Sequence, residues 1–194
     1  MIQRFSEPLL PTEHGQFRCV VYRHGDIEHV AMVVGDVTGH DVLCRVHSEC
    51  LTSEVLGSVK CDCKVQLDRA LKRIQKEGRG VVLYLRQEGR GIGLGNKIAA
   101  YALQEQGHDT VDANRLLGLP DDTRDYTVAA RMLQDLGVEG VALMTYNPLK
   151  IEGLEKGGIA VDRVSHLVAA PSHHAAGYLV TKAERMGHMY AADA

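Results

Sequence analysis

From residue 63 onward, amphipathic helix patterns alternate with short apolar runs. Apolar residues recur at helical spacing over residues 63–77, and Gly78 follows at the position where helices commonly end. The runs at 80–86, 140–145 and 159–164 are rich in apolar residues, which is typical of strands buried beneath helices. Because alternating strands and helices build one layered sheet, this half of the chain predicts an α/β arrangement.

The first third of the chain is patterned differently. Residues 17–22, 29–37 and 41–48 are short, Val-rich runs separated by turns that contain Gly, Asp or His, and no helical period is present before residue 50. We therefore predict an α/β (α+β mixed) fold, in which a β-rich N-terminal part is followed by alternating strands and helices around a mixed sheet. We treat residues 1–194 as a single domain.

Three further helices are expected after residue 90. The first follows the glycine-rich turn QEGRGIGLGN and ends near Gln106. The second has Asp121 or Asp122 as its N-terminal cap, and Pro148 suits the first turn of the third. The C-terminal pattern predicts a loop over residues 168–177 and a closing helix after it.

The five cysteines divide into two groups. Cys19 and Cys44 lie in apolar, strand-like runs, where a thiol usually acts as a small buried side chain. Cys50, Cys61 and Cys63 lie in a polar stretch, and a disulfide would leave one of them unpaired. Zinc prefers thiolates in tetrahedral geometry, and three thiolates leave its fourth position open. This ligand number is typical of a catalytic zinc site.

Composition limits the classes of partner. The chain has 194 residues, of which 45% are hydrophobic, and a formal net charge of -3, so a nucleic-acid-binding surface is not indicated. No apolar run is long enough to span a membrane, and the N-terminus lacks the apolar core of a signal peptide. Together with free thiols, this indicates a cytoplasmic protein. Residues 60–97 carry a surplus of Lys and Arg, which permits an anionic ligand.

Other functional classes agree less well with the motifs. The run H-S-E-C is similar to the H-x-E of zinc deaminases, but the P-C-x-x-C that follows in those enzymes is missing. A zinc-stabilised nucleic-acid or interaction module would need a fourth ligand and a basic charge. The turn QEGRGIGLG fits neither the G-x-G-x-x-G pattern nor the P-loop.

Two stretches in combination, RVHSECLTSEVLGSVKCDCKVQLDRAL and LRQEGRGIGLGNKIAAYALQEQGHDTVDAN, resemble GTP cyclohydrolase II, and the resemblance covers almost the whole chain. It implies hydrolysis of GTP to 2,5-diamino-6-(5-phosphoribosylamino)pyrimidin-4(3H)-one, formate and pyrophosphate, the first step of riboflavin biosynthesis. It also implies one Zn²⁺ per chain, Mg²⁺ with the GTP phosphates, and a homodimer. A relative that stops at the formylated pyrimidine, or that feeds a secondary-metabolite pathway, is the alternative.

The resemblance also assigns the site residues. Cys50, Cys61 and Cys63 match the zinc ligands. Asp122 matches the proton acceptor, Arg124 a nucleophile toward the α-phosphate, and Tyr101 a tyrosine near the opened imidazole. The remaining matches are contacts to the nucleotide: Arg45, Val46, His47, Ser48, Glu49, Gln66, Glu88, Gly89, Arg90, Thr110, Thr145 and Lys150.

Several of these residues have a plainer interpretation. Asp122 is also a good helix cap, and Arg124 a surface residue or an electrostatic stabiliser of pyrophosphate, because a guanidinium is a poor nucleophile. Tyr101 lies on the apolar face of its helix, as a core residue does. For His47 we favour a place behind the metal ligands over direct ligation. A carboxylate such as Glu49 suits the N–H groups of guanine.

Overall fold

The computed structural model describes residues 2–120 and 122–165, without the side chains of Thr110 and Val111. The expected loop and closing helix after residue 167, and the alternative cap Asp121, lie outside the described residues. Within the described ranges, no helix is long and apolar enough to cross a membrane.

A mixed sheet forms the centre of the molecule, in the order β1-β3-β4-β6-β5-β7-β8, with β2 paired to β3. The first strands pair antiparallel, as does β4 with β6, whereas β5 runs parallel to β6 and β7, and β7 parallel to β8. The predicted mixed sheet with a β-rich opening is confirmed. The strands are β1 (Gln3–Arg4), β2 (Leu9–Thr12), β3 (Gly15–His24), β4 (Ile27–Val34), β5 (Val42–Ser48), β6 (Gly80–Leu85), β7 (Gly140–Met144) and β8 (Ala160–Ser165).

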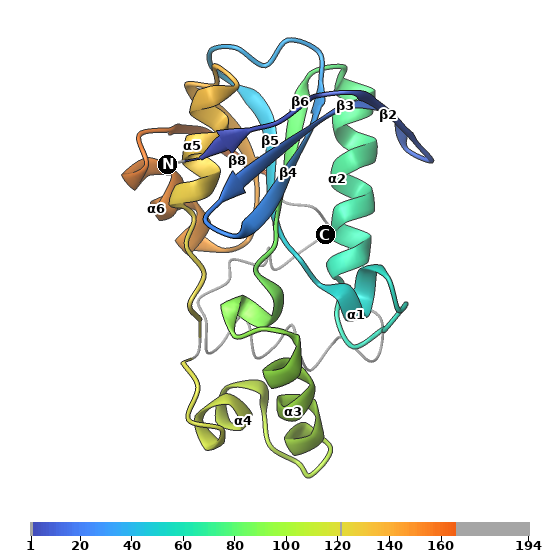
Figure 1. Cartoon of the computed structure of the whole chain (residues 1–194), viewed down its shortest axis with the longest axis vertical. Coiled ribbons are helices and arrows are strands. Elements are labelled where there is room, and N and C mark those ends of the chain that lie inside the picture. The colour runs from blue at the N-terminus through green and yellow to red at the C-terminus, as the bar shows by residue number, and fades with distance from the viewer. Residues whose placement is uncertain (1, 121, 166–194) are drawn as a thin grey trace.

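Helices cover both faces of the sheet. In Figure 1, α2 lies on one side of the strands and α5 and α6 lie on the other, while α3 and α4 lie below the sheet. The helices are α1 (Leu51–Glu54), α2 (Cys63–Glu77), α3 (Leu94–Gln104), α4 (Thr110–Leu116), α5 (Thr127–Asp135) and α6 (Pro148–Lys156), with a 3-10 turn at Glu88–Gly91.

The central strands are apolar on both faces because each face meets a helix. Along β5, Val42, Cys44 and Val46 belong to the core that includes α5, whereas Leu43 belongs to the core that includes α2. Burial raises the pKa of the Cys44 thiol to about 12, so this cysteine is the inert core residue that its context predicts. Cys19, in β3, is only partly buried.

The helix boundaries agree with the glycine signals but not with the aspartate cap. Gly78 ends α2 in the left-handed conformation, with φ 73°, as predicted. The prediction that Asp121 or Asp122 caps the helix that follows is wrong for the described Asp122: α5 begins at Thr127, whose backbone N–H donates to Asp125. Two short helices, α1 and α4, were not predicted, because four to seven residues are too few for a clear periodicity.

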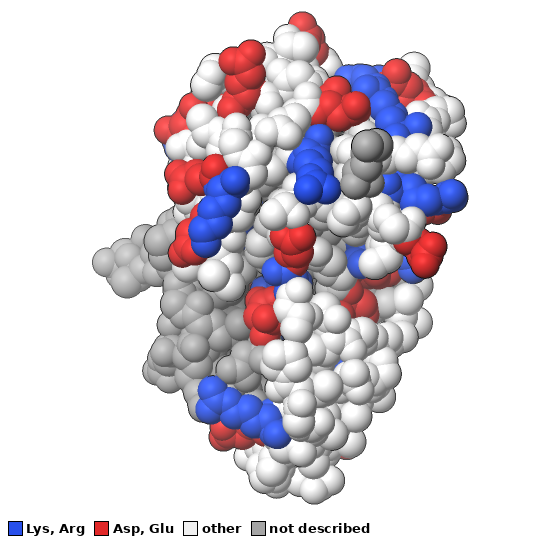
Figure 2. All heavy atoms as spheres, turned by 60° about the vertical axis from the view of Figure 1, so that its left-hand side comes forward, with Lys and Arg blue, Asp and Glu red and all other residues white. Residues whose placement is uncertain are grey.

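Charges of both signs are mixed on the visible surface. In Figure 2, Lys and Arg stand among Asp and Glu over the upper part of the molecule, which holds the sheet. The lower part, which holds α3 and α4, shows few charges on this face. The described residues of this face form no broad patch of one sign, in keeping with a net charge of -3.

Candidate active site

A cleft opens where the parallel strands β5, β6 and β7 end, the edge at which α/β sheets usually bind ligands. It encloses about 1020 Å³ of empty space, its solvent-open mouth included. Most of the residues that the sequence assigns to a site line it. They are Arg45, His47, Ser48, Glu49, Cys50, Cys63, Gln66, Glu88, Gly89, Arg90, Tyr101, Arg124, Thr145 and Lys150.

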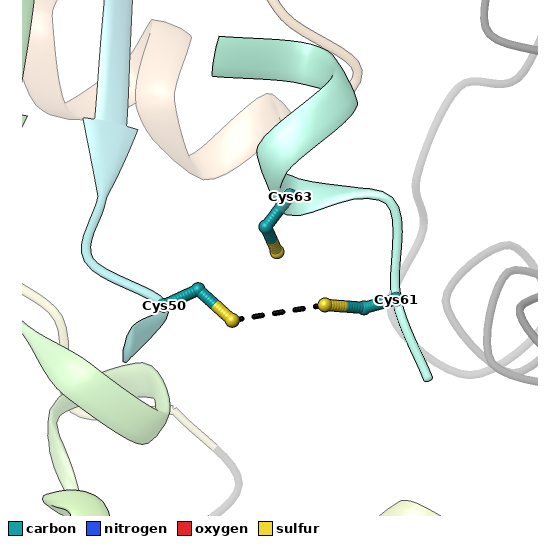
Figure 3. Close-up of side chains that lie close together, drawn as sticks. All are labelled: Cys50, Cys61 and Cys63. Carbon is teal, nitrogen blue, oxygen red and sulfur yellow. Dashed lines mark hydrogen bonds between the residues drawn. The ribbon is translucent and has the colours of Figure 1, made fainter. Parts of the chain in front are cut away.

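The three predicted metal ligands converge beside this cleft. Cys50 caps α1, Cys63 is the first residue of α2, and Cys61 lies two residues before it. The Sγ atoms lie within 4.8 Å of one another, with Cys50 and Cys61 at 3.6 Å, and Figure 3 shows all three side chains pointing to one point. Such a donor set fits a zinc ion with one open position.

Cys50 has polar neighbours from other elements. The ammonium of Lys97, in α3, donates to Cys50 Sγ at 3.1 Å and to Glu88 Oε1 at 2.8 Å. Hydrogen bonds from the thiols of Cys61 and Cys63, together with the Lys97 charge, lower the pKa of Cys50 far below its usual range. Burial alone would lower the pKa of Lys97, but Glu88 and Cys50 outweigh this effect and raise it.

Glu88 is fully engaged within the protein. Its Oε2 accepts from the backbone N–H of Leu51 at 2.7 Å, and its Oε1 accepts from Gly89 N–H at 2.7 Å and from Lys97. Glu88 therefore joins the glycine-rich turn to α1 and to the cysteine cluster. The sequence alone assigns no role to Lys97, which is marked there only by the surplus of Lys and Arg over residues 60–97.

The glycine-rich turn is held in an unusual conformation. Gly89 and Arg90 both have left-handed backbones, with φ 61° and 60°, which costs a non-glycine residue about 1–2 kcal/mol. The carbonyl of Arg90 accepts from Thr123 N–H at 3.0 Å. A Cβ at Gly91 would lie 2.2 Å from Thr123 Oγ1, so only glycine allows this approach. The turn and the segment before α5 thus bring Arg90 and Arg124 into one cleft.

Arg124 is bound by Asp122. Its Nε lies 2.9 Å from Asp122 Oδ1 and its Nη2 lies 2.5 Å from Oδ2, and its backbone N–H also donates to Oδ1, at 3.0 Å. Burial would raise the pKa of Asp122, but the hydrogen bonds and charge of Arg124 lower it below the ordinary value. Only 12% of the Arg124 side chain is exposed, so it is not an ordinary surface arginine.

A buried chain of hydrogen bonds runs from the sheet to the cysteines. Arg45 donates to the carbonyl of Met144 at 2.8 Å and to Gln66 Oε1. Gln66 in turn donates to Asp62 Oδ2 at 2.5 Å, and Asp62 lies between Cys61 and Cys63 in the sequence. Asp62 is buried and was not predicted as a site residue. Because an acceptor and a donor hold its two ends, the Gln66 amide has a fixed orientation.

His47 lies behind the cysteines rather than among them. Its Nε2 is 2.6 Å from Glu54 Oε1, and the hydroxyl of Tyr84 donates to Glu54 Oε2 at 2.5 Å. The rings of His47 and Tyr84 stack with centroids 5.8 Å apart. Burial lowers the pKa of His47, so the ring is neutral at neutral pH. Glu54 was missed because no sequence pattern connects it with His47.

Glu49 has a partly sheltered carboxylate. Its side chain is 15% exposed, Arg86 Nε lies 3.6 Å from its Oε2, and burial raises its pKa. Ser48, the last residue of β5, lines the cleft beside it. A carboxylate in this position can accept hydrogen bonds from the N–H groups of a ligand.

The remaining predicted contacts differ in what they can offer a ligand. Lys150 is buried and donates to the carbonyl of Val46 at 2.7 Å. The Val46 side chain lies in the core, and Val46 is not among the residues that line the cleft. Thr145 Oγ1 accepts from Asn147 N–H at 3.0 Å at the end of β7. Thr110 lies in α4, and its side chain is outside the described part of the chain.

Tyr101 lines the cleft rather than filling the core. The Lys60 ammonium lies 4.7 Å from the centre of its ring, and that of Lys97 lies 5.9 Å away. Burial raises the pKa of the Tyr101 phenol, so it keeps its proton at neutral pH and can donate a hydrogen bond. A core position, the plainer interpretation of its helical spacing, does not account for its place in the cleft wall.

Comparison with known proteins gives a consistent result. A GTP cyclohydrolase II family model matches residues 3–166. "GTP cyclohydrolase-2" of Actinobacillus succinogenes is 53% identical over 96% of this chain and 88% of its own length. "Riboflavin biosynthesis protein RibBA" of Mycobacteroides abscessus is also 53% identical over 96% of this chain, and the chain spans about half of that relative, 47%. A solved two-domain 3,4-dihydroxy-2-butanone 4-phosphate synthase from A. baumannii, RibBX, matches at 22% identity with a TM-score of 0.47, over 87% of this chain and 40% of that one, and carries no weight. The chain belongs to the GTP cyclohydrolase II family.

Proposed function

We propose that this chain hydrolyses GTP to 2,5-diamino-6-(5-phosphoribosylamino)pyrimidin-4(3H)-one, formate and pyrophosphate, as the first step of riboflavin biosynthesis. The observation that carries the proposal is one cleft that combines a three-cysteine cluster with two arginines, Arg90 and Arg124. A purine ring needs an activated water to open it, and a triphosphate needs cations to hold it. Membership of the GTP cyclohydrolase II family supports the choice of GTP.

In this proposal Cys50, Cys61 and Cys63 hold one zinc ion. Zinc held there would act as a Lewis acid and would lower the pKa of a bound water toward ~7. Tyr101 lines the same cleft and donates a hydrogen bond to the formyl oxygen as negative charge develops there. Because burial raises the pKa of Tyr101, its phenol stays protonated at neutral pH and can donate this hydrogen bond.

In this proposal Glu49 distinguishes guanine from adenine in the substrate. Guanine presents N1–H and an amino group, and both donate to the Glu49 carboxylate, whereas adenine has an unprotonated N1. With adenine bound, the sheltered Glu49 carboxylate would face a nitrogen that has no hydrogen to donate. The lost hydrogen bond would weaken the binding of adenine by about 1–3 kcal/mol or more. The shelter of the Glu49 side chain, 15% exposed, supports this role.

The phosphates are bound by Arg90 and Arg124, with Mg²⁺ as the further cation. A guanidinium is planar, permanently charged and able to donate two parallel hydrogen bonds to phosphate oxygens. We assign Arg124 to electrostatic stabilisation of the departing pyrophosphate, because it stays protonated beside Asp122. In this proposal Asp122 orients Arg124, rather than acting as the proton acceptor that the resemblance implies.

A homodimer is a further part of the proposal and rests on the family resemblance. We also propose a cytoplasmic location, because the three-cysteine site requires reduced thiols.

The test is incubation of the protein with GTP, Mg²⁺ and Zn²⁺, followed by quantification of formate and pyrophosphate and by mass analysis of the pyrimidine. We expect all three products from GTP and little turnover of ATP. Retention of selectivity for GTP in Glu49→Ala would move base recognition to another residue. A formylated pyrimidine as the final product would favour the alternative of a family member that stops at that stage, and absence of both small products would refute the proposal.

A further inference from the structure

Lys97 occupies a place in the cleft that neither base recognition nor phosphate binding explains. Its ammonium lies between Cys50 Sγ, at 3.1 Å, and Glu88 Oε1, at 2.8 Å, and its side chain is only 13% exposed. Glu88 is itself fixed by the backbone N–H groups of Leu51 and Gly89. The position of the ammonium is therefore set by the protein framework and not by a flexible surface contact.

The net negative charge of a metal bound by three thiolates explains why a cation beside the cluster would be useful. Three thiolates outweigh a divalent cation by one negative charge, and thiolates donate more electron density to a metal than neutral histidines do. A hydrogen bond from a cation to one sulfur withdraws part of that density, as groups behind metal ligands commonly do. Cys50 receives such a bond here, and it is the most buried of the three clustered cysteines, 5% exposed.

We propose that Lys97 is a positioning residue of the metal centre: held by Glu88, its ammonium donates a hydrogen bond to the Cys50 thiolate while the metal is bound. The inference rests on the metal centre of the proposed function. Its effect is to limit electron donation from the sulfur, so that the metal remains a strong Lewis acid despite three anionic ligands. Lys97 then acts through Cys50 and makes no contact with the phosphates.

Cobalt(II) in place of zinc tests this without any enzymatic assay, because absorption bands arising from sulfur-to-cobalt charge transfer report the electron density on the thiolates. The spectra of wild type, Lys97→Met and Lys97→Arg are compared. Lys64→Met is the matched control: Lys64 is next to Cys63 in the sequence, but its ammonium binds Asp68 at 2.9 Å. If Lys97→Met does not fold, Lys97→Gln takes its place.

We expect the charge-transfer bands of Lys97→Met to move to longer wavelength, since an unbonded thiolate gives up an electron more easily. Lys97→Arg, which keeps a cationic donor, should move less, and Lys64→Met should match wild type. Formate release by the zinc form of Lys97→Met should fall about 10–100-fold, with pyrophosphate release retained.

Unchanged cobalt bands in Lys97→Met would overturn the inference. So would a rise in KM for GTP with a parallel loss of pyrophosphate release, because that result makes Lys97 a phosphate ligand. If wild type binds no cobalt or zinc at all, the metal centre of the proposed function fails and the inference fails with it. If wild type binds metal normally and Lys97→Met shows the same cobalt bands, only this inference fails and the proposed function stands.

Discussion

The Asp122 carboxylate accepts hydrogen bonds from both Nε and Nη2 of Arg124, at 2.9 and 2.5 Å. A carboxylate whose two oxygens are occupied by a guanidinium is a poor proton acceptor, because protonation would break the ion pair. The pair instead fixes the direction in which Arg124 enters the cleft. This geometry supports our proposal that Arg124 binds the phosphates and that Asp122 orients it.

Replacing Asp122 by Asn should slow pyrophosphate release about 100-fold, because misplacing a positioning group by about 1 Å has an effect of this size. Rapid quantification of pyrophosphate from GTP measures it. Asp125→Asn is the control, since Asp125 binds Thr127 at the start of α5. A wild-type rate in Asp122→Asn would show that Arg124 needs no orientation by a carboxylate.

The same ion pair predicts a pH dependence of stability. The pKa of Asp122 is lowered in the folded state by Arg124, so its stabilising contribution is present above the ordinary value of 3.8 and is lost as pH falls through the lower folded value. The difference in Tm between wild type and Asp122→Asn should therefore stay constant from about pH 8 to about pH 5 and shrink only in stronger acid. A difference that disappears near neutral pH would contradict a lowered pKa.

Gly91→Ala should separate the glycine-rich turn from the segment that carries Arg124. The residue has φ 88°, and the new Cβ would meet Thr123 Oγ1 at 2.2 Å. Gly93→Ala is the matched control, because Gly93 has a similar φ of 85° with open space around it. Both variants carry backbone strain of about 1–3 kcal/mol, because neither positive φ suits a side chain. We expect a greater loss of pyrophosphate release in Gly91→Ala; equal losses would show that strain alone accounts for both.

Tyr101→Phe should accumulate the formylated pyrimidine while pyrophosphate release continues. Loss of one hydrogen-bond donor to a developing oxyanion costs about 3 kcal/mol, or at least about a hundredfold in rate. Product mass measures the effect, and Tyr84→Phe, whose hydroxyl binds Glu54 behind the cleft, is the comparison. Deformylated product at the wild-type rate would leave Tyr101 as a packing residue.

Local signals in the sequence predicted much of the fold. The spacing of apolar residues and Gly78 predict α2 with its observed ends, and continuous apolar runs predict β6 and β7. The same local signals fail at Asp122, since an aspartate before a helix reads as a cap whether it binds a backbone N–H or an arginine two residues on. That choice depends on the surroundings of the side chain, which the local sequence does not specify.

The candidate site likewise contains residues that sequence motifs identify and residues that only the folded structure reveals. The cysteines and the glycine-rich turn each form a short motif, and the family resemblance carried by the two in combination assigned them to one site. Lys97 and Glu54 escaped prediction because their partners come from other elements. Asp62 escaped prediction although its partner Gln66 lies only four residues on. Lys97, in the first turn of α3, meets Cys50, the N-terminal cap of α1, and no residue pattern records that proximity.

The central claim is that one cleft performs two separable hydrolyses, ring opening at the cysteines and phosphate cleavage at the arginines. It is tested most directly by counting formate and pyrophosphate together from Cys61→Ser protein incubated with GTP and Mg²⁺. The Cys61 sulfur lies 3.6 Å from that of Cys50, so the substitution removes one donor from the metal cluster and leaves Arg90 and Arg124 in place. We predict GMP and pyrophosphate without formate. Formate at the wild-type rate, or loss of both products while GTP still binds, would contradict it.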